Sequence, residues 1–542
     1  MEKKGKLELT WVGKYEEEKL EPRILIEDKS KSYGDPNTEN MLIHGDNLLV
    51  LKALERDYAG KIKCIYIDPP YNTGAAFEHY DDNIEHSIWL NAMYNRLRIL
   101  KNLLSEDGFL CCQIDDSEGF YLKIMLDEIF GRDNYLTTFY IQVRYSNKTL
   151  AEDSDYQKII EQCHVYAKRK SSAKLNRPQA EYEIDKFKWK IKELTSGDVV
   201  TLGNKRVEIF KPGQYDIEEI EPCLEGLKET WATGALSRVK ASAGEFFELY
   251  LAERKEIDGL GCLYKVEGIG EDGLGYRYIS GPKKATANKG KFYSGIPIKR
   301  LEELKSGTSV KYLPVSNFYD FSGAFGNCRL EGGVGFKGGK KPEALLKMIL
   351  DYFTNEGDLV LDSFAGSAST AAVAHKMNRK WITIELGEHA YSLCKNRLDS
   401  VIDGDRTGIT KEVDWQGGGG YKFYELAEPL LVKNKVLPVY QINPSYTWDM
   451  VCEAICKIEG FTYEPSGEFQ GHSSENRFIH ITEEFVNIKY VMSIMKNLGD
   501  KQSLLIYCKK NQADMILPEN VEVKKIPKDL LDKCNFESEV QE

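Results

Sequence analysis

Short runs of consecutive apolar residues, each followed by an acidic residue, recur along this chain of 542 residues. The apolar β-branched run in residues 62–67 predicts a buried strand and leads directly into Asp68. A second run at residues 359–361 leads into Asp362. Helical patterns alternate with such strands over residues 41–168, and this alternation predicts an α/β fold. Open α/β sheets place their chemistry at the carboxyl ends of the strands, which is where these acids fall.

The residues that follow the first of these strands are chemically distinctive. They read Asp68, Pro69, Pro70 and Tyr71. The two prolines fix φ and remove two backbone donors, so their carbonyls remain as rigidly held acceptors. A carboxylate, a fixed carbonyl and an aromatic ring suit an exocyclic amine on a flat ring such as a nucleobase. Asp-Pro-Pro is also found as an ordinary strand-ending turn, so this motif alone leaves both interpretations open.

A loop of small residues follows the second strand. It contains Phe364, Ala365, Gly366 and Ser367 and leads into a predicted helix through residues 371–374. Small residues allow a ligand to approach the backbone, and a helix N-terminus offers unpaired N–H groups. The next predicted strand ends in Glu385, about 20 residues beyond the loop, where an acid is well placed to bind ribose hydroxyls. The order strand, loop, helix, strand, acid predicts a nucleoside site.

Together these motifs resemble those of DNA amino-methyltransferases that use S-adenosylmethionine. Asp68 to Tyr71 is similar to the family's target-amine motif, and Phe364-Ala365-Gly366 is similar to its cofactor loop. The target-amine motif precedes the cofactor loop, an order that marks the circularly permuted β class. The Gly-rich stretch 415–423 resembles the end of the methyltransferase core in modification (Mod) subunits of type III restriction–modification systems. In place of the second Gly that the family often has, this chain has Ala368, which implies an altered cofactor pocket that still functions.

The resemblance implies an α/β fold: a Rossmann-like class I methyltransferase core, circularly permuted, with an inserted mixed α+β target-recognition domain and a C-terminal α/β domain. The expected divisions are an N-terminal extension (1–40), a catalytic half of the core (41–168), a target-recognition domain (169–335), a cofactor-binding half of the core (336–425) and a domain for assembly or partner docking (426–542). In the last of these, residues 501–508 predict a buried strand with a partner at residues 478–481.

The resemblance also implies roles for individual residues. Asp68 and the Pro69 carbonyl accept the hydrogens of the target amine, Tyr71 stacks on the base, and the base flips out of the duplex to reach them. Asp46 contacts the adenine of the cofactor, Glu385 its ribose, and Asp362 to Ser367 its methionine end. The expected cofactor-binding residues are Asp46, Asn47, Lys341, Pro342, Asp362, Phe364, Ala365, Gly366, Ser367 and Glu385. The Asp-first form of the motif favours adenine N6 as the acceptor.

The overall charge is unusual for a DNA-binding protein, because the formal net charge is −12. Charge is local, however, and the segment 283–300 has no acidic residue. Its basic residues are Lys283, Lys284, Lys289, Lys291, Lys299 and Arg300. A solvated loop and a set of phosphate contacts are both consistent with this run.

Composition and resemblance together define the expected partners and compartment. No phosphate-binding loop of the type found in ATPases is present, so DNA cleavage would need a helicase–nuclease restriction subunit. The resemblance further implies double-stranded DNA as partner and a homodimer. The twelve cysteines lack C-x-x-C pairs, and we expect reduced thiols, no metal, no membrane segment and a cytoplasmic location.

Two alternatives stay open from the sequence. The first is another methyltransferase, acting on cytosine N4 in DNA or on an RNA base. The second is a non-catalytic DNA-recognition subunit of a defence complex, although folding alone does not require Asp68, Pro69, Pro70, Tyr71 and Glu385 together.

Overall fold

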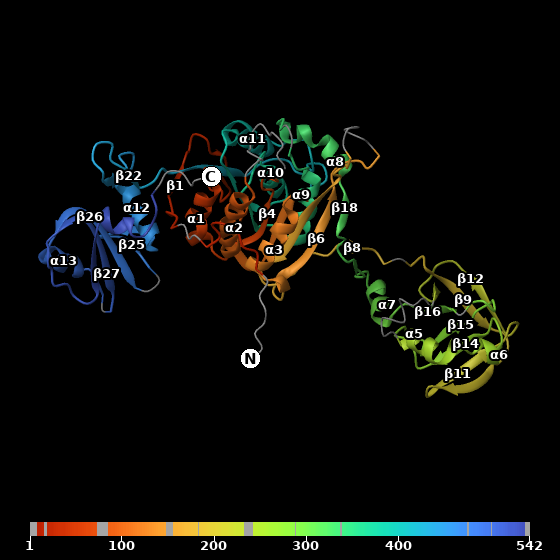
Figure 1. Ribbon diagram of the computed structural model, residues 1–542. Coiled ribbons are helices and arrows are strands. Elements are labelled where there is room, and N and C mark those ends of the chain that lie inside the picture. Colours follow the sequence, from red (N-terminus) through yellow and green to blue (C-terminus); the bar gives the residue numbers. More distant parts are fainter. Residues whose placement is uncertain are drawn as a thin grey trace. The chain divides into compact units, whose positions relative to one another are not determined.

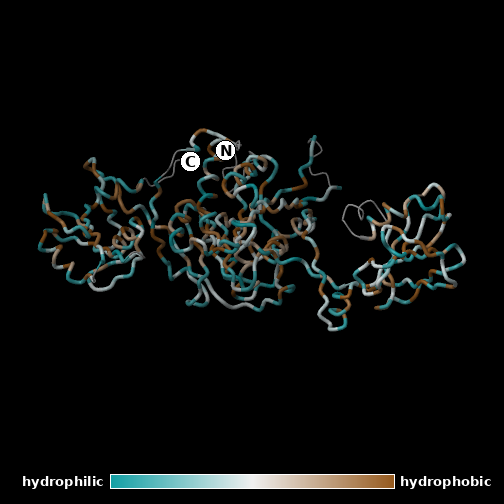
Figure 2. The backbone as a smooth tube through the Cα atoms, turned by 90° about the horizontal axis from the view of Figure 1, so that it is seen from below, coloured by the Kyte–Doolittle hydropathy of each residue, from teal (hydrophilic) through white to brown (hydrophobic). Residues whose placement is uncertain are grey.

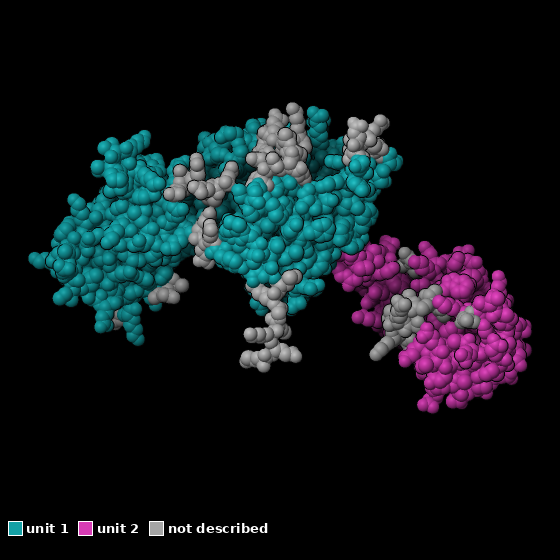
Figure 3. All heavy atoms as spheres, in the orientation of Figure 1, with its two compact units in different colours: residues 1–176, 316–542 teal, residues 177–315 magenta. Residues whose placement is uncertain are grey.

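The computed structural model describes most of the chain. The described residues are 8–15, 19–72, 85–147, 155–182, 184–231, 242–287, 289–336, 339–473, 476–499 and 501–536. The chain divides into two compact units (Figure 3). Unit 1 contains residues 1–176 and 316–542, and unit 2 contains residues 177–315.

An eleven-stranded sheet forms the centre of unit 1 (Figure 1). Its order is β1-β21-β3-β20-β19-β4-β5-β7-β6-β18, and β2 pairs with β21. The strands are β1 (Leu25–Glu27), β2 (Tyr33–Gly34), β3 (Met41–His44), β4 (Ile62–Ile67), β5 (Leu104–Ile114), β6 (Tyr135–Gln142), β7 (Ile160–Ala167), β18 (Phe318–Asp320), β19 (Leu359–Asp362), β20 (Lys380–Glu385) and β21 (Gly420–Leu426). The six strands from β21 to β5 are mutually parallel, and β7 runs antiparallel to both of its neighbours.

Helices cover the sheet in two groups. The first group is α1 (Asn47–Tyr58), α2 (His86–Leu103) and α3 (Gly119–Phe130), which pack on one another. The second is α9 (Glu343–Phe353), α10 (Ser369–Lys376) and α11 (Lys395–Ile402), and a short helix α8 (Ser322–Asn327) precedes it. The apolar faces of the first group pack on the central strands, and together they form one buried core. Parallel sheets are normally covered on both faces. Along the backbone, apolar stretches alternate with polar ones (Figure 2).

The strands predicted from the apolar runs are present. Residues 62–67 form β4, residues 359–361 lie in β19 and residues 381–384 lie in β20. Strand β4 pairs in parallel with β19, so elements almost 300 residues apart in sequence meet at the centre of the sheet. Strand β3 lies between β20 and β21, on the same side of β4 as the small-residue loop.

Unit 2 is built around an eight-stranded antiparallel sheet in the order β10-β11-β14-β15-β16-β13-β9-β12. The strands are β9 (Phe187–Glu193), β10 (Asp198–Leu202), β11 (Lys205–Phe210), β12 (Tyr215–Glu219), β13 (Leu227–Trp231), β14 (Leu263–Glu267), β15 (Tyr276–Ser280) and β16 (Lys291–Ser294). Short helices α5 (Ser242–Phe246), α6 (Lys255–Asp258) and α7 (Ile298–Lys305) accompany it. A two-stranded ladder of β8 (Gln179–Ala180) and β17 (Lys311–Tyr312) joins the points where the chain enters and leaves the unit.

The C-terminal part of unit 1 has a sheet of its own, in the order β24-β25-β26-β27-β28. Its elements are β22 (Leu431–Lys433), β23 (Tyr440–Ile442), α12 (Trp448–Glu459), β24 (Thr462–Ser466), β25 (Phe469–His472), β26 (Arg477–Val486), α13 (Ile488–Met495), β27 (Ser503–Asn511), β28 (Val521–Lys525) and α14 (Lys528–Leu531). The predicted pairing of residues 478–481 with the strand near residue 505 is confirmed, because β26 and β27 are parallel neighbours. No described helix combines the length and the apolar composition needed to cross a membrane.

Candidate active site

Four predicted site acids gather at one edge of the central sheet. Asp68 follows β4, Asp362 ends β19, Glu385 ends β20, and Asp46 follows β3 by two residues. These four strands are parallel neighbours, so their carboxyl ends must meet. The predicted target-amine motif and the predicted cofactor loop therefore lie side by side.

The side chains of the target-amine motif are fixed by a dense polar network. The Tyr71 hydroxyl donates to Asp68 Oδ1 at 2.7 Å, and the Trp89 indole donates to the Pro70 carbonyl at 2.9 Å. Tyr71 is partly buried against the core of the sheet. Tyr71 thus holds one oxygen of the Asp68 carboxylate in place.

Lys341 lies in this pocket as well. Its ammonium is 2.8 Å from Asp68 Oδ2 and 5.0 Å from the centre of the Tyr71 ring, so it occupies one face of that ring. The sequence analysis predicts a cofactor contact for Lys341, and the structure places its ammonium against Asp68, the acid of the predicted target-amine motif. Burial lowers the pKa of Lys341, but attraction by Asp68 and a second carboxylate outweighs burial, and the net pKa is raised. Burial raises the pKa of Asp68, and the Lys341 charge opposes that rise.

The second carboxylate is Glu161 on β7, which sequence reasoning missed. Glu161 Oε2 lies 2.8 Å from the Tyr71 hydroxyl, whose single hydrogen can point to Glu161 or to Asp68. It accepts a hydrogen bond from Gln113 Nε2 at 2.6 Å and lies 3.5 Å from Lys341 Nζ. Because β7 is antiparallel, its amino end reaches the edge where the other strands end. The sequence feature that could indicate Glu161 is its position as an acid near the start of the strand that leads into residues 165–168.

The small-residue loop turns tightly between β19 and α10. Gly366 and Ala368 both adopt left-handed backbone conformations, with φ of 54° and 55°. A non-glycine residue with positive φ is uncommon, and Ala368 is fully buried at the N-cap of α10. The altered position in the family motif therefore keeps the backbone shape that a glycine would adopt. Glu385 Oε2 accepts the Gly366 N–H at 2.8 Å and so ties the loop to β20.

The remaining predicted cofactor residues surround this loop. Asn47 Nδ2 donates to the Ser363 carbonyl at 2.7 Å, whereas the Asp46 carboxylate caps α1 through the Leu49 N–H at 3.0 Å. Burial raises the pKa of Asp362 to about 7, although an N–H of the loop donates to its carboxylate. Phe364 packs against the core, Ala365 is buried, Ser367 is buried beside α11, and Pro342 is the N-cap of α9.

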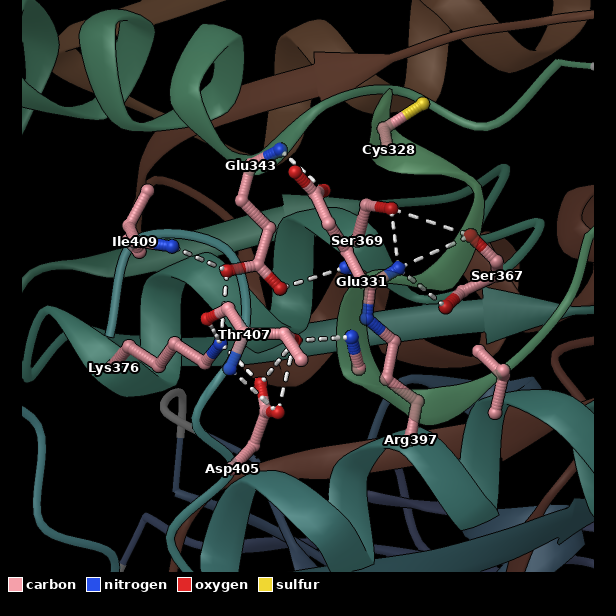
Figure 4. Close-up of polar contacts among 12 residues, drawn as sticks. Cys328, Glu331, Glu343, Ser367, Ser369, Lys376, Arg397, Asp405, Thr407 and Ile409 are labelled. Carbon is pink, nitrogen blue, oxygen red and sulfur yellow. Dashed lines mark hydrogen bonds and ion pairs between the residues drawn. The ribbon is translucent and has the colours of Figure 1, made fainter. Parts of the chain in front are cut away.

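A buried ionic network supports the loop from behind (Figure 4). Arg397 on α11 donates to Ser369 Oγ at 2.6 Å and to the Ser367 carbonyl at 3.2 Å, and it pairs with Glu343 at 2.8 Å. Glu343 also accepts from Lys376 at 2.9 Å. None of these charged side chains is exposed, so the network fixes the loop through α9, α10 and α11.

The basic residues of segment 283–300 have different environments within unit 2. Lys283, Lys284, Lys289 and Lys299 are exposed. Lys291 pairs with Glu229 at 2.5 Å, and Arg300 pairs with Glu303 at 2.5 Å. Two of the six charges are therefore partly neutralised within the protein. Among the described residues there is no cluster of three or more potential metal ligands.

The sequence of this chain is similar to those of known DNA-modifying proteins. The family model described as DNA methylase matches residues 62–396. The chain is 34% identical over 419 residues to the probable type III restriction–modification enzyme HindVI Mod subunit of Haemophilus influenzae, covering 74% of this chain and 55% of that protein. It is 28% identical over 438 residues to the type III EcoPI Mod subunit of Escherichia phage P1, covering 69% and 61%. The chain thus spans a little over half the length of these curated relatives.

Among solved structures, the chain is similar to PvuII DNA methyltransferase (cytosine-N4-specific) with a TM-score of 0.34 and 14% identity, over 70% of this chain and 91% of that one. The family model covers more than half of the chain and includes Asp68, Lys341, the small-residue loop and Glu385. The chain belongs to the DNA methylase family.

Proposed function

We propose that this chain transfers a methyl group from S-adenosylmethionine to adenine N6 of a base flipped out of duplex DNA. The observation that carries the proposal is the position of Asp68, Pro69, Pro70 and Tyr71 beside the small-residue loop and Glu385, at one edge of the sheet of a DNA methylase. Nothing in a parallel sheet by itself requires this set of residues at this edge.

The residues around the loop fit the proposed cofactor. The hydroxyl oxygens of Ser363 and Thr383 are buried, and neither has a hydrogen-bond partner among the described residues. Both lie next to the loop, on or just after β19 and β20. Buried polar groups normally have partners, so these hydroxyls suit a polar ligand at this edge. When bound, the cofactor supplies an electrophilic sulfonium methyl group.

The chain's own residues then orient and polarise the acceptor. The lone pair of an aromatic amine is delocalised into the ring, which makes the amine a poor nucleophile. Asp68 and the Pro69 carbonyl accept its two hydrogens and expose the lone pair toward the methyl group. The Tyr71 ring stacks on the base through the face that Lys341 leaves open. Orientation of this kind lowers a barrier by about 7–11 kcal/mol at best.

The larger assembly follows from the relatives. HindVI Mod and EcoPI Mod are named as subunits of type III restriction–modification enzymes. We infer that this chain is a modification subunit with the permuted β-class motif order, that it forms a homodimer, that unit 2 reads the DNA sequence, and that the C-terminal part docks a helicase–nuclease partner. The order of the motifs, with Asp68 before the small-residue loop, supports this assignment.

The function is tested by single-molecule sequencing of DNA from a methylation-free host that expresses the chain. We expect N6-methyladenine at one short motif. N4-methylcytosine would keep the mechanism and change the acceptor base. A folded protein that binds S-adenosylmethionine and leaves all DNA unmodified would contradict the proposal.

Glu385→Gln is expected to weaken S-adenosylmethionine binding by about ten- to a hundredfold, because a carboxylate hydrogen bond to a sugar hydroxyl contributes about 1.5–3 kcal/mol. Isothermal titration calorimetry measures the effect. The matched control is Glu388→Gln, because Glu388 is exposed and three residues further on. Unchanged affinity in the Glu385 variant would exclude the ribose role.

Replacing Lys283, Lys284 and Lys289 together by Gln is expected to reduce the dependence of log K on log salt concentration by up to about 3, because each phosphate contact contributes about 0.9 to that slope. These three are exposed, whereas Lys291 is engaged by Glu229. Binding titrations between low and moderate salt give the slope. The control replaces Lys509, Lys510 and Lys525, which are exposed in the C-terminal part. Equal salt-dependence slopes in both variants would indicate that the segment 283–300 is a solvated loop without phosphate contacts.

A further inference from the structure

The proposed reaction leaves a proton to be removed, and this requirement is set by charge balance. The sulfonium carries one positive charge before transfer. When the methyl group bonds to the amine nitrogen, that charge moves to the nitrogen, which then bears a methyl group and two hydrogens. One N–H bond must break, with its electron pair staying on nitrogen, before a neutral methylated base can leave. A group in the pocket has to receive this proton.

The pocket holds two carboxylates that one hydroxyl connects. Tyr71 Oη lies 2.7 Å from Asp68 Oδ1 and 2.8 Å from Glu161 Oε2, so its hydrogen can point to either oxygen. Lys341 Nζ is 2.8 Å from Asp68 and 3.5 Å from Glu161. With one cation and two carboxylates, the cluster carries a net negative charge next to the nitrogen where positive charge develops.

We propose that Glu161 is the proton acceptor of this site, reached from the amine through Asp68 and the Tyr71 hydroxyl. An amine N–H bond breaks and an O–H bond forms on Asp68. That proton then moves from Asp68 to Tyr71 Oη while the hydroxyl proton of Tyr71 moves to Glu161 Oε2. The relay restores the Asp68 carboxylate and the neutral tyrosine, and it leaves Glu161 protonated. This inference rests on the proposed function and adds a residue to it.

The surroundings of Glu161 suit the end of such a relay. Gln113 Nε2 holds Glu161 Oε2 at 2.6 Å, and Tyr66 in turn donates to Gln113 Oε1 at 2.6 Å. The Glu161 side chain is 17% exposed, so the proton can pass on to water. The buried hydroxyl of Tyr71 has a pKa raised well above its ordinary value, which keeps it neutral between turnovers.

The other titratable groups near the cluster are less suitable acceptors. Tyr66 is fully buried, with a raised pKa, and donates to Gln113. Asp362 is buried and engaged by the Phe364 N–H and by Thr370. Cys112 and Cys163 are buried thiols, and burial raises the pKa of Cys112. Among the charged side chains that the structure describes near Asp68, only Glu161 shares a hydroxyl with it.

The relay is tested with Glu161→Gln and Tyr71→Phe in single-turnover methylation of DNA from a methylation-free host. Each variant is expected to lose about a hundredfold in rate, the size of a proton-transfer contribution. The double variant is expected to lose no more than the slower single variant, because both changes interrupt the same path. Affinity for S-adenosylmethionine stays at the wild-type value.

The pH dependence separates the loss of the Glu161 charge beside Asp68 from a change in the fold. Activity requires ionised Asp68, so the rate falls as the pH falls through the pKa of Asp68. The Glu161 charge is one of the causes that raise this pKa. In Glu161→Gln the acid limb of the rate profile should therefore move to lower pH while the plateau falls. A residue that only supported the fold would lower the plateau without this shift.

The control is Glu459→Gln, because Glu459 also accepts from a tyrosine, Tyr507, and pairs with a lysine, Lys524, in the C-terminal part. If Glu161→Gln has a lower melting temperature than the wild type, the rate of Tyr71→Phe becomes the test of the relay, because this variant keeps the aromatic ring and both carboxylates. Three results would overturn the relay and leave the proposed function in place. They are an acid limb of the rate profile that does not move in Glu161→Gln, rate losses that multiply in the double variant, and single variants with the wild-type rate. Absence of N6-methyladenine with the wild-type chain would instead overturn the proposed function.

Discussion

Asp68→Asn is expected to reduce methyl transfer by about a hundred- to a thousandfold and to leave S-adenosylmethionine affinity nearly unchanged. The loss corresponds to removing one preorganised group that acts on charge developing in the transition state. An asparagine keeps the shape of the side chain, but it can present an N–H toward the amine or toward Lys341, where only acceptors are favourable. The single-turnover rate and the calorimetric affinity for the cofactor measure the two halves of this prediction.

The matched control for this variant is Asp107→Asn. Asp107 lies on β5, close to β4, but at its amino end, where it pairs with Lys63. The same chemical change at the opposite edge of the sheet should leave the rate within about twofold. If Asp68→Asn abolished cofactor binding instead of the rate, the assignments of the two halves of the site would have to be exchanged.

The acids at the ends of parallel strands were predictable from sequence. A run of apolar residues marks a buried strand, and the residue after it in an α/β sheet lies at the carboxyl edge. This pattern predicts Asp68, Asp362 and Glu385, and the structure places them at the carboxyl ends of three neighbouring strands, β4, β19 and β20. Local pattern was sufficient here because the fold class decides where such strands end.

Glu161 and Lys341 could not be placed in the same way. Glu161 enters the site at the amino end of an antiparallel strand, and no local pattern reveals the direction of β7 relative to β5. Lys341 precedes a helix in the second half of the chain, and only the pairing of β4 with β19 brings it near Asp68. Lys291 appeared free of acids in sequence, but its partner Glu229 lies on the neighbouring strand. All three positions depend on pairings between distant segments.

The buried network behind the small-residue loop also depends on long-range packing, and it leads to the largest expected effect on stability. Glu343 lies between two buried cations, Arg397 and Lys376, and Asp405 is the other acid of the group. The four charges balance. Glu343→Gln would leave one uncompensated positive charge in the interior, and breaking a buried ion pair costs about 3–5 kcal/mol.

Urea denaturation followed through the tryptophan signal measures the free energy of unfolding of this variant. The control is Asp351→Asn on the same helix, because Asp351 forms a more exposed ion pair with Lys347 and should cost less than about 1 kcal/mol. Equal losses in the two variants would show that the Glu343 network contributes no more than a surface pair. In the double variant Glu343→Gln/Lys376→Met, the losses should not add, because one cation leaves with the acid.

The stability of Glu343→Gln relative to the wild type should also depend on pH with a definite sign. Burial raises the pKa of Glu343, but attraction by Arg397 and Lys376 outweighs it, and the net pKa lies below the ordinary value of 4.5. A lowered pKa means that the carboxylate stabilises the folded state above pH 4.5 and loses this contribution as the pH falls through the folded-state pKa. Glutamine does not titrate in this range. The difference in unfolding free energy between the wild type and Glu343→Gln should therefore be largest at neutral pH and should decrease as the pH falls below 4.5. Arg397 also donates to Ser367 and Ser369 of the loop region. Because Glu343→Gln removes the charge that positions Arg397, the variant should also bind S-adenosylmethionine more weakly at neutral pH. A difference that is constant across this pH range would mean that Glu343 acts through its shape alone.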